Sequence, residues 1–370
     1  MEFLINGFAA VTWQHVVMWV IGGVLILLAI VKKLEPALLL PMGFGAILVN
    51  IPFSSAVNQG ETIGILDWLF NTGIEISEAM PLILFIGIGA MIDFGPLLEN
   101  PKLFMFGVFA QSGIFLTILI AAAMGFDIKD ACAIGIIGAA DGPTSIYVAN
   151  VLGSKYFAPI MVVAYSYMAL VPIIQPAVIK CLTTKKERQI RMQYNSANVS
   201  KTTRILFPIV ITLIAGLFAP MSVSLVGCLM FGNLIRECGV LDNLSETASK
   251  VLSNLITLLL GISIASQMKG ENFLQTQTLM IMALGLMAFI LDTAVGVIAG
   301  KVYNIFAKTK INPMIGAAGI SAFPMSARVV QKLGLEADRT NHLLMFSIGC
   351  NVSGQVASAI AGGIILSLML

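Results

Sequence analysis

Long apolar runs occupy most of this chain and decide where it can fold. Only 11% of the residues are charged and 58% are hydrophobic, whereas a soluble domain carries about 25% charged residues. Lipid must cover this much apolar surface, because a helix of about 20 apolar residues spans the bilayer core. We therefore predict an all-α, polytopic membrane protein with about ten spanning helices. The candidate spans are 16–31, 36–52, 79–93, 103–125, 158–179, 204–219, 221–236, 251–267, 278–300 and 343–370.

Two further apolar stretches, 131–152 and 311–327, have a different composition. They are crowded with Gly, Ala, Pro, Ser, Thr and Asn, which make poor continuous helices but suit breaks inside a membrane protein. We therefore expect each of them to be a broken or re-entrant segment.

The basic residues test the topology, because cytoplasmic loops carry excess Lys and Arg. The 181–203 loop holds five basic residues against one acid, whereas 53–78 holds four acids and no Lys or Arg. We place the first loop in the cytoplasm and the second outside. The chain can reach these sides of the membrane only if 131–152 enters from outside and returns to the outside. In the same way, 311–327 must enter from the cytoplasm and return to the cytoplasm.

A short internal repeat agrees with that topology. The sequence Ile-Gly-Ala-Ala occurs at 137–140 and again at 315–318. Matching motifs on segments of opposite orientation are typical of inverted-topology repeats, whose broken helices meet at a substrate site. We predict a first repeat at 1–180, the cytoplasmic basic loop at 181–203, and a second repeat at 204–370.

Asp141 is the main chemical candidate, since it is the only acid in 131–179. An ionised carboxylate in hydrocarbon is costly, so it is expected to face a cavity or a partner. Gly142 and Pro143 interrupt the helix and free backbone carbonyls, and Thr144 and Ser145 add hydroxyl oxygens. Such an all-oxygen set suits a hard cation such as Na⁺. The alternative is that Asp141 only caps the following half-helix.

The second break begins at Asn312 and contains Gly316 and Ser321. An amide oxygen, a hydroxyl and unwound carbonyls can again bind a cation without adding charge. Arg328 follows at the cytoplasmic end, where its planar fork suits a carboxylate. An interfacial arginine placed by the positive-inside rule explains it equally well.

Other polar residues within the spans leave alternatives open. Tyr165 and Tyr167 are either packed phenols or part of a proton relay. Asp292 either joins the ion path or pairs structurally. The polar cluster at 351–355 fits helix packing at least as well as ion binding.

Four motifs together resemble the beta subunit of the sodium-pumping, biotin-dependent decarboxylases. They are Gly-Ala-Ala-Asp-Gly-Pro-Thr at 138–144, Ala-Tyr-Ser-Tyr-Met-Ala-Leu-Val-Pro at 164–172, Ile-Asn-Pro-Met-Ile-Gly-Ala-Ala-Gly at 311–319, and the Glu-Pro start and Leu-rich core of 35–52. The resemblance runs from about residue 20 to the end of the chain.

The resemblance implies a membrane subunit that decarboxylates carboxybiotin, consumes a proton and exports Na⁺. By motif position it assigns Asp141, Asn312, Gly316 and Ser321 to Na⁺, and the carboxybiotin end to Arg328 and Asn312. The catalytic set would be Asp141, Tyr167, Ser321 and Arg328, with Tyr167 handling the proton.

The resemblance also implies partners and a location. Carboxybiotin would be presented by a biotin carrier protein or domain, alongside a carboxyltransferase (alpha) subunit and a small single-span gamma or delta subunit. We expect a homo-oligomer of this subunit in the bacterial cytoplasmic membrane. The net charge of +2 gives no reason to expect a nucleic-acid partner. A secondary transporter that moves an organic anion with Na⁺ or H⁺ is the alternative function.

Overall fold

The predicted all-helical architecture is confirmed. A computed structural model describes residues 2–194 and 199–370, so residues 195–198 of the predicted basic loop lie outside the described part. Within the described residues the only extended pairing is one isolated bridge between Gln59 and Thr62. The chain is therefore a helical protein without a sheet over these ranges.

The helices follow one another closely along the chain. Those of the first half are α1 (Glu2–Ala9), α2 (Trp13–Val31), α3 (Pro36–Val49), α4 (Ile65–Phe70), η1 (Asn71–Glu75), α5 (Ala79–Met91), α6 (Gly95–Glu99), η2 (Pro101–Leu103), α7 (Phe104–Ala110), α8 (Ser112–Ala123), α9 (Ile128–Gly135), η3 (Ile136–Ala139), α10 (Gly142–Val151), α11 (Phe157–Leu182) and α12 (Lys185–Arg188). Those of the second half are α13 (Lys201–Phe218), η4 (Pro220–Ser222), α14 (Val223–Glu237), α15 (Asp242–Glu246), η5 (Thr247–Leu252), α16 (Ser253–Ile264), η6 (Ala265–Gln267), α17 (Gly270–Phe273), α18 (Thr276–Phe306), α19 (Met314–Ala317), α20 (Met325–Ala337) and α21 (Leu344–Met369).

Seven helices in the described ranges are long and apolar enough to cross a membrane, or eight if one bent pair counts as a span. This number is lower than the ten or so expected, although every expected span is helical. Three of the expected spans form α3, α5 and α14, which have only 14, 13 and 15 residues. At 1.5 Å per residue, about 20 Å of helix is shorter than the bilayer core of about 30 Å.

The bent pair corrects the expectation that 53–78 is simply an outer loop. Helix α4 and the π-helical turn η1 form an apolar helix over Ile65–Glu75, which meets α5 at an angle of 67°. The assignment from charge counted the acids of this segment and did not consider its apolar residues, which form the helix. Only the part before Ile65 is a loop.

Glycine pairs let neighbouring helices cross at backbone contact. A Cβ added at Gly232 of α14 would lie 2.0 Å from the Ile86 carbonyl oxygen, and one added at Gly89 of α5 would lie 1.9 Å from that of Leu229. Small residues at such crossings are the usual means of close helix packing in membranes, where lipid and helix are equally apolar. Close backbone packing at these glycines therefore holds the two short helices α5 and α14 together.

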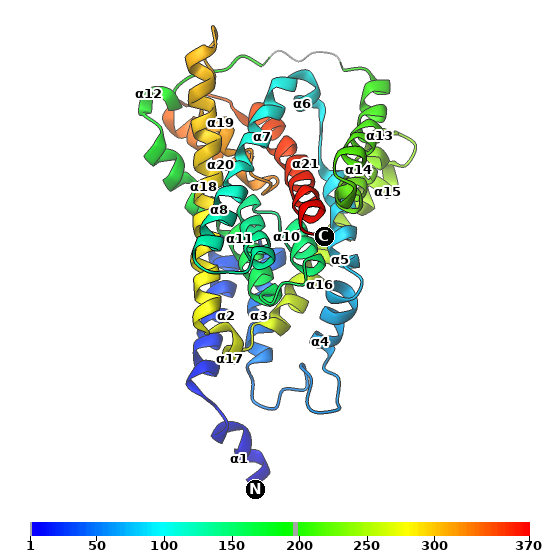
Figure 1. Ribbon diagram of the computed structural model, residues 1–370, viewed down its shortest axis with the longest axis vertical. Helices are drawn as coiled ribbons and strands as arrows, with labels where there is room; N and C mark the ends of the chain where they lie inside the picture. The colour runs from blue at the N-terminus through cyan, green and yellow to red at the C-terminus, as the bar shows by residue number, and fades with distance from the viewer. Residues whose placement is uncertain (1, 195–198) are drawn as a thin grey trace.

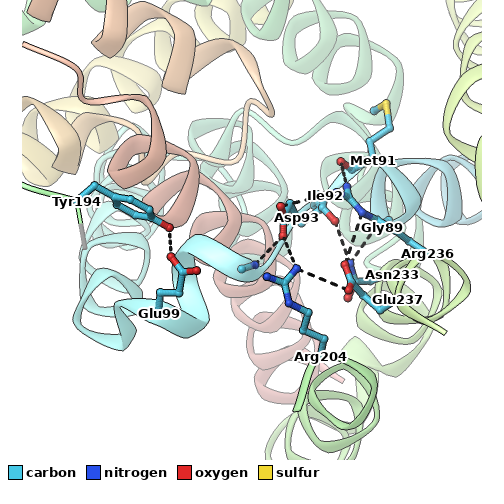
Figure 2. A network of polar contacts seen from close by, with 11 residues as sticks. Gly89, Met91, Ile92, Asp93, Glu99, Tyr194, Arg204, Asn233, Arg236 and Glu237 are labelled. Atoms are coloured by element: carbon cyan, nitrogen blue, oxygen red, sulfur yellow. Dashed lines mark hydrogen bonds and ion pairs between the residues drawn. The ribbon is translucent and has the colours of Figure 1, made fainter. Parts of the chain in front are cut away.

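Charged residues join the ends of α5, α13 and α14 (Figure 2). Arg204 lies 3.5 Å from Asp93 and 3.9 Å from Glu237, and Arg236 lies 3.8 Å and 3.5 Å from the same two acids. Arg236 also donates to the Met91 carbonyl at 2.8 Å. A cation at the carbonyl end of a helix is favoured by the helix dipole. This cluster fixes the end of α5 next to the basic loop.

The longest helix, α18, runs along most of the molecule (Figure 1). The N-terminal helix α1 lies at one end, whereas α6, α12 and α19 lie at the other. Helices α10 and α21 are near the middle of the same view. Residues 131–149 and 312–322 of the two predicted breaks are all buried, so both breaks are covered by neighbouring helices.

We predict that Gly232→Ala destabilises the protein, because the new methyl group meets the Ile86 carbonyl and must push α5 away from α14. Overpacking of this kind costs about 1–3 kcal/mol. Thermal unfolding in detergent measures the effect. The matched control is Gly23→Ala in α2, where an added Cβ has no neighbour within 4 Å. Equal unfolding temperatures for both variants would contradict the close crossing.

Candidate functional site

Asp141 lies at the point where the first broken segment changes direction. Helix η3 ends at Ala139, Ala140 has left-handed backbone with φ 53°, and Asp141 is the N-cap of α10. A left-handed alanine is uncommon and marks a sharp, held turn. The Asp141 side chain is 3% exposed. The break therefore buries a carboxylate at the start of a helix.

Only neutral groups donate to this carboxylate in the described structure. Its Oδ2 accepts hydrogen bonds from Thr144 Oγ1 at 2.7 Å and from Ser358 Oγ at 2.8 Å, and the Thr144 amide lies 3.4 Å from Oδ1. No Lys, Arg or His of the described residues lies within ion-pair distance. A buried carboxylate without a charged partner is costly, so a bound cation or a proton is the natural compensation.

The second broken segment contacts the first directly. Helix α19 ends at Ala317 and α20 begins at Met325, which leaves seven residues without regular helix. The Ser321 amide in this stretch donates to the Ala139 carbonyl at 2.9 Å. The Ser321 hydroxyl donates to the Gly354 carbonyl of α21 at 2.9 Å. The two breaks and α21 thus form one polar centre.

Helix α21 bridges the two breaks with one face. Asn351 donates to the Ile320 carbonyl at 2.7 Å, Gln355 donates to the Ser321 carbonyl, and Ser358 donates to Asp141. These residues are spaced i, i+4 and i+7, which places them on the same side of a helix. The 351–355 cluster, whose role the sequence left open, is therefore part of the centre.

Side-chain amides satisfy the unwound carbonyls of the second break. Besides Asn351 and Gln355, Gln175 of α11 donates to the Ala317 carbonyl at 2.7 Å, and Gln111 donates to that of Gly319 at 3.1 Å. Each of these carbonyls therefore has one internal hydrogen bond and keeps a second lone pair, so their expected role as cation ligands stays a prediction.

The same four amides leave four buried oxygens without a donor. The side-chain oxygens of Gln111, Gln175, Asn351 and Gln355 have no hydrogen-bond partner in the described structure. An unsatisfied buried acceptor costs about 1–3 kcal/mol, and a hard cation satisfies such oxygens well. The second break is therefore lined by amide oxygens without donors, and Ser358 on the same helix as Asn351 and Gln355 contacts the carboxylate of the first break.

Asn312 and Gly316 have other contacts. Asn312 Nδ2 donates to the carbonyls of Arg188 and Ile190, both at 2.9 Å, and its Oδ1 accepts from the Met314 amide at 3.1 Å. An added Cβ at Gly316 would lie 1.9 Å from the Gly296 carbonyl oxygen of α18. In this structure Asn312 therefore fastens the basic loop to α19, and Gly316 packs α19 against α18.

The two tyrosines of α11 contact different parts of the structure. The Tyr165 ring lies against Gly142, where an added Cβ would be 2.5 Å from its Cζ, and the Tyr165 hydroxyl is buried without a partner. Tyr167 instead donates to the Met282 carbonyl at 2.5 Å. Residues two apart point to different sides of a helix. The phenol nearer to the Asp141 turn is thus Tyr165.

Asp292 lies outside the amide cluster. It is 1% exposed on α18, and its two carboxylate oxygens face the backbone of Gly113 at the start of α8 and that of Gly138 in η3, both of which lack a side chain. A carboxylate at the first turn of a helix is favoured by the helix dipole. The geometry fits a carboxylate that stabilises the kink between α7 and α8.

Arg328 lines a separate cavity of about 420 Å³. Its walls come from the turn between α2 and α3, from α11 and from α20, and they include four basic and two acidic side chains. Lys180 and Glu336 form an ion pair at 3.1 Å, whereas Arg328 has no ion pair within the described residues. An unpaired guanidinium in a concave, basic site is suited to bind an anion.

The comparisons with known proteins agree with the resemblance over nearly the whole chain. Residues 14–369 match the family described as Na⁺-transporting oxaloacetate decarboxylase beta subunit. The glutaconyl-CoA decarboxylase subunit beta of Acidaminococcus fermentans is 46% identical over 98% of this chain and 96% of that protein. The methylmalonyl-CoA decarboxylase subunit beta of Propionigenium modestum is 44% identical over 98% and 97%, respectively.

A third relative carries the oxaloacetate name. The oxaloacetate decarboxylase beta chain of Klebsiella pneumoniae is 43% identical over 96% of this chain and 95% of that protein. Beta subunits named for three different substrates are therefore similar to this chain over nearly their whole length. The chain belongs to the family of beta subunits of Na⁺-transporting decarboxylases, and it is a multi-pass membrane component of such an enzyme.

Proposed function

We propose that this subunit removes CO₂ from carboxybiotin at the Arg328 cavity and uses the reaction to export Na⁺ through the centre at Asp141, with consumption of a proton. The observation that carries the proposal is the polar centre itself. It joins both broken segments, holds a buried carboxylate without a charged partner, and contains amide oxygens without donors.

Na⁺ is the cargo of this reaction, and the oxygens of the centre fit it. Na⁺ is a hard cation that prefers carboxylate, carbonyl and hydroxyl oxygens. We propose that Asp141 and Ser321 hold the ion together with Asn351 and Gln355, whose side-chain oxygens lack a donor. Because a carboxylate binds either a proton or a cation, Na⁺ and H⁺ compete at Asp141.

The remaining residues assigned by resemblance have supporting parts in this proposal. Asn312 and Gly316 hold the start of the second break through the contacts described above. For proton handling we propose both phenols of α11: Tyr167, which packs beside Gly285 of α18, and Tyr165, which covers Gly142. The Tyr165 ring lies at the first break, where a proton must arrive to replace Na⁺, and Tyr167 lies two residues further along the same helix.

The Arg328 cavity is the proposed carboxybiotin site. Carboxybiotin carries a carboxylate, and four basic side chains line the cavity. A volume of about 420 Å³ lies within the range of about 300–1,000 Å³ that is typical of small-molecule sites. The biotin would arrive on a carrier protein or domain, charged by a carboxyltransferase (alpha) subunit, with a small gamma or delta subunit in the membrane and further copies of this chain.

We also propose that the chain consists of two inverted repeats, 1–180 and 204–370, joined by the basic loop 181–203. Each repeat contributes one broken segment to the centre, as in transporters whose half-helices meet near the midplane of the bilayer. The hydrogen bond between the Ser321 amide and the Ala139 carbonyl supports this arrangement.

Asp141→Asn is expected to abolish both CO₂ release and Na⁺ transport while the protein still inserts. Asparagine has the same shape and can still accept hydrogen bonds from Thr144 and Ser358. Its side chain is neutral, however, so it takes up no proton and offers no negative charge to Na⁺. Na⁺-dependent decarboxylation and ²²Na⁺ uptake into inverted vesicles are the measurements. Asp130→Asn is the matched control, since Asp130 is also buried but accepts hydrogen bonds from the Ser154 hydroxyl and the Lys155 amide, which are not part of the polar centre. Retained Na⁺ activation in Asp141→Asn would remove Asp141 from the ion path.

Asn351→Ala is expected to raise the Na⁺ concentration for half-maximal activation about fivefold or more, because the ion loses one oxygen ligand. One lost contact of about 1–3 kcal/mol corresponds to about five- to 150-fold in affinity. The control is Asn233→Ala, which removes another buried amide whose oxygen has no donor. Asn233 lies on α14 and donates to the Ile92 carbonyl at the end of α5 (Figure 2). An unchanged Na⁺ dependence in Asn351→Ala would contradict the proposed ligand set.

Arg328→Ala is expected to raise the KM for carboxybiotin while leaving the Na⁺ dependence nearly unchanged, since the guanidinium lines the cavity and not the amide cluster. Arg328→Lys should recover only part of the loss, because an ammonium cannot bind a carboxylate with a planar fork. Arg339→Ala, just beyond α20 and outside the cavity lining, serves as the control for lost positive charge. A larger effect on Na⁺ activation than on KM would place Arg328 in the ion path.

A further inference from the structure

Glu35 is the one acid of the Arg328 cavity that has no partner in the described structure. The cavity walls carry Lys33 and Glu35 from the turn between α2 and α3, Lys180 from α11, and three charged residues of α20, which are Arg328, Lys332 and Glu336. Glu336 is neutralised by Lys180. Glu35 forms neither an ion pair nor a side-chain hydrogen bond among these residues.

The backbone holds Glu35 in a fixed position. Lys33 and Glu35 both have left-handed backbone, with φ 53° and 35°, on either side of the buried Leu34. The Glu35 carbonyl accepts hydrogen bonds from the amides of Leu38 and Leu39 and so begins α3. Non-glycine residues in this conformation persist where the surroundings over-determine them, often at functional sites. The turn therefore presents a lysine and a glutamate to the same cavity.

We propose that Glu35 is the general acid that protonates biotin as carboxybiotin loses CO₂ in this cavity. The inference rests on the proposed function, and it names the residue that supplies the proton at the reacting nitrogen. Decarboxylation breaks the bond between the carboxylate carbon and the ureido nitrogen, and the electron pair stays on that nitrogen. A proton must be delivered there, and Glu35 is the cavity's unpaired carboxyl group.

The charges around Glu35 are arranged for such a transfer. Burial raises the pKa of Glu35 above its ordinary value, and Arg328 opposes this rise. When an anionic carboxylate occupies Arg328, the guanidinium no longer counteracts burial at Glu35, so the acid holds its proton more firmly. Binding of the substrate thus favours the protonated, donor form of the acid.

Release of CO₂ reverses this arrangement. The carboxylate that engaged Arg328 leaves as a neutral molecule, Glu35 has become an anion, and the guanidinium is free to stabilise it. Glu35 then takes up a proton from water in the cavity before the next carboxybiotin binds. Every turnover therefore consumes one proton at this residue, in agreement with the proton consumption of the proposed reaction.

The test compares Glu35→Gln, Glu35→Asp and Glu336→Gln in the assembled decarboxylase complex, with free carboxybiotin as substrate at saturating Na⁺. General acid catalysis contributes about 10²–10⁴ in rate. Glu35→Gln is expected to lower kcat by about a hundredfold or more and to leave KM unchanged or lower, because glutamine resembles the neutral acid. Glu35→Asp should recover part of kcat.

The pH profile separates a proton donor from a structural residue. In the wild type the rate is full while Glu35 is protonated and falls as the pH rises through its pKa in the substrate complex. Glu35→Asp should retain this alkaline limb at a shifted position, Glu35→Gln should lose it, and Glu336→Gln, which removes the other acid of the cavity, should retain it.

Three outcomes decide the matter. Wild-type kcat and an unchanged alkaline limb in Glu35→Gln would overturn the role of Glu35 and leave the proposed function intact. Loss of the alkaline limb in Glu336→Gln would also overturn it, since the pH dependence would then follow the charge of the cavity and not Glu35. If the wild-type complex releases no CO₂ from carboxybiotin, the proposed function itself fails.

Discussion

The hydrogen bond from the Ser321 amide to the Ala139 carbonyl is the contact on which the functional centre depends. It joins two segments that are distant in the chain and unwound at the same place. Unwound backbone inside a membrane protein is tolerated only where its polar groups find internal partners. Helix α21 supplies those partners through Asn351, Gln355 and Ser358. The breaks, the buried carboxylate and α21 are therefore mutually dependent.

Composition and periodicity were enough to predict the helical membrane fold and the positions of both breaks. Long apolar runs and low charge leave few alternatives, and Gly142 and Pro143 favour the start of a helix over its interior, as their place in the first turn of α10 shows. Asp141 was also identifiable, because an isolated acid in an apolar segment needs a partner. The number of full spans was overestimated, since hydrophobicity alone does not reveal that α3 and α14 end after 14 and 15 residues.

The contacts of individual side chains were not predictable from residue type. Tyr165 and Tyr167 are chemically identical, and only the orientation of α11 decides which ring covers Gly142. An amide such as Asn312 binds a cation or two carbonyls equally well, and its pairing with the basic loop depends on chain segments far apart in sequence. The amides of α21 looked like packing residues because their orphaned oxygens appear only once their NH₂ groups are paired.

The second break provides a physical link between the proposed chemistry and the proposed ion site. Ser321 lies at the centre, and α20, which begins at Met325, carries Arg328 into the cavity. The Ser326 hydroxyl lies within hydrogen-bonding distance of the Ala318 and Ala322 carbonyls, which belong to the same unwound stretch as the Ile320 and Ser321 carbonyls held by the α21 amides. In the proposed function, a change in charge at Arg328 would act on the start of α20 and, through these bonds, on the unwound stretch that the α21 amides hold. A ligand shifts an equilibrium only by its differential affinity for the two states, and here the differing charges of carboxybiotin and biotin would supply that difference.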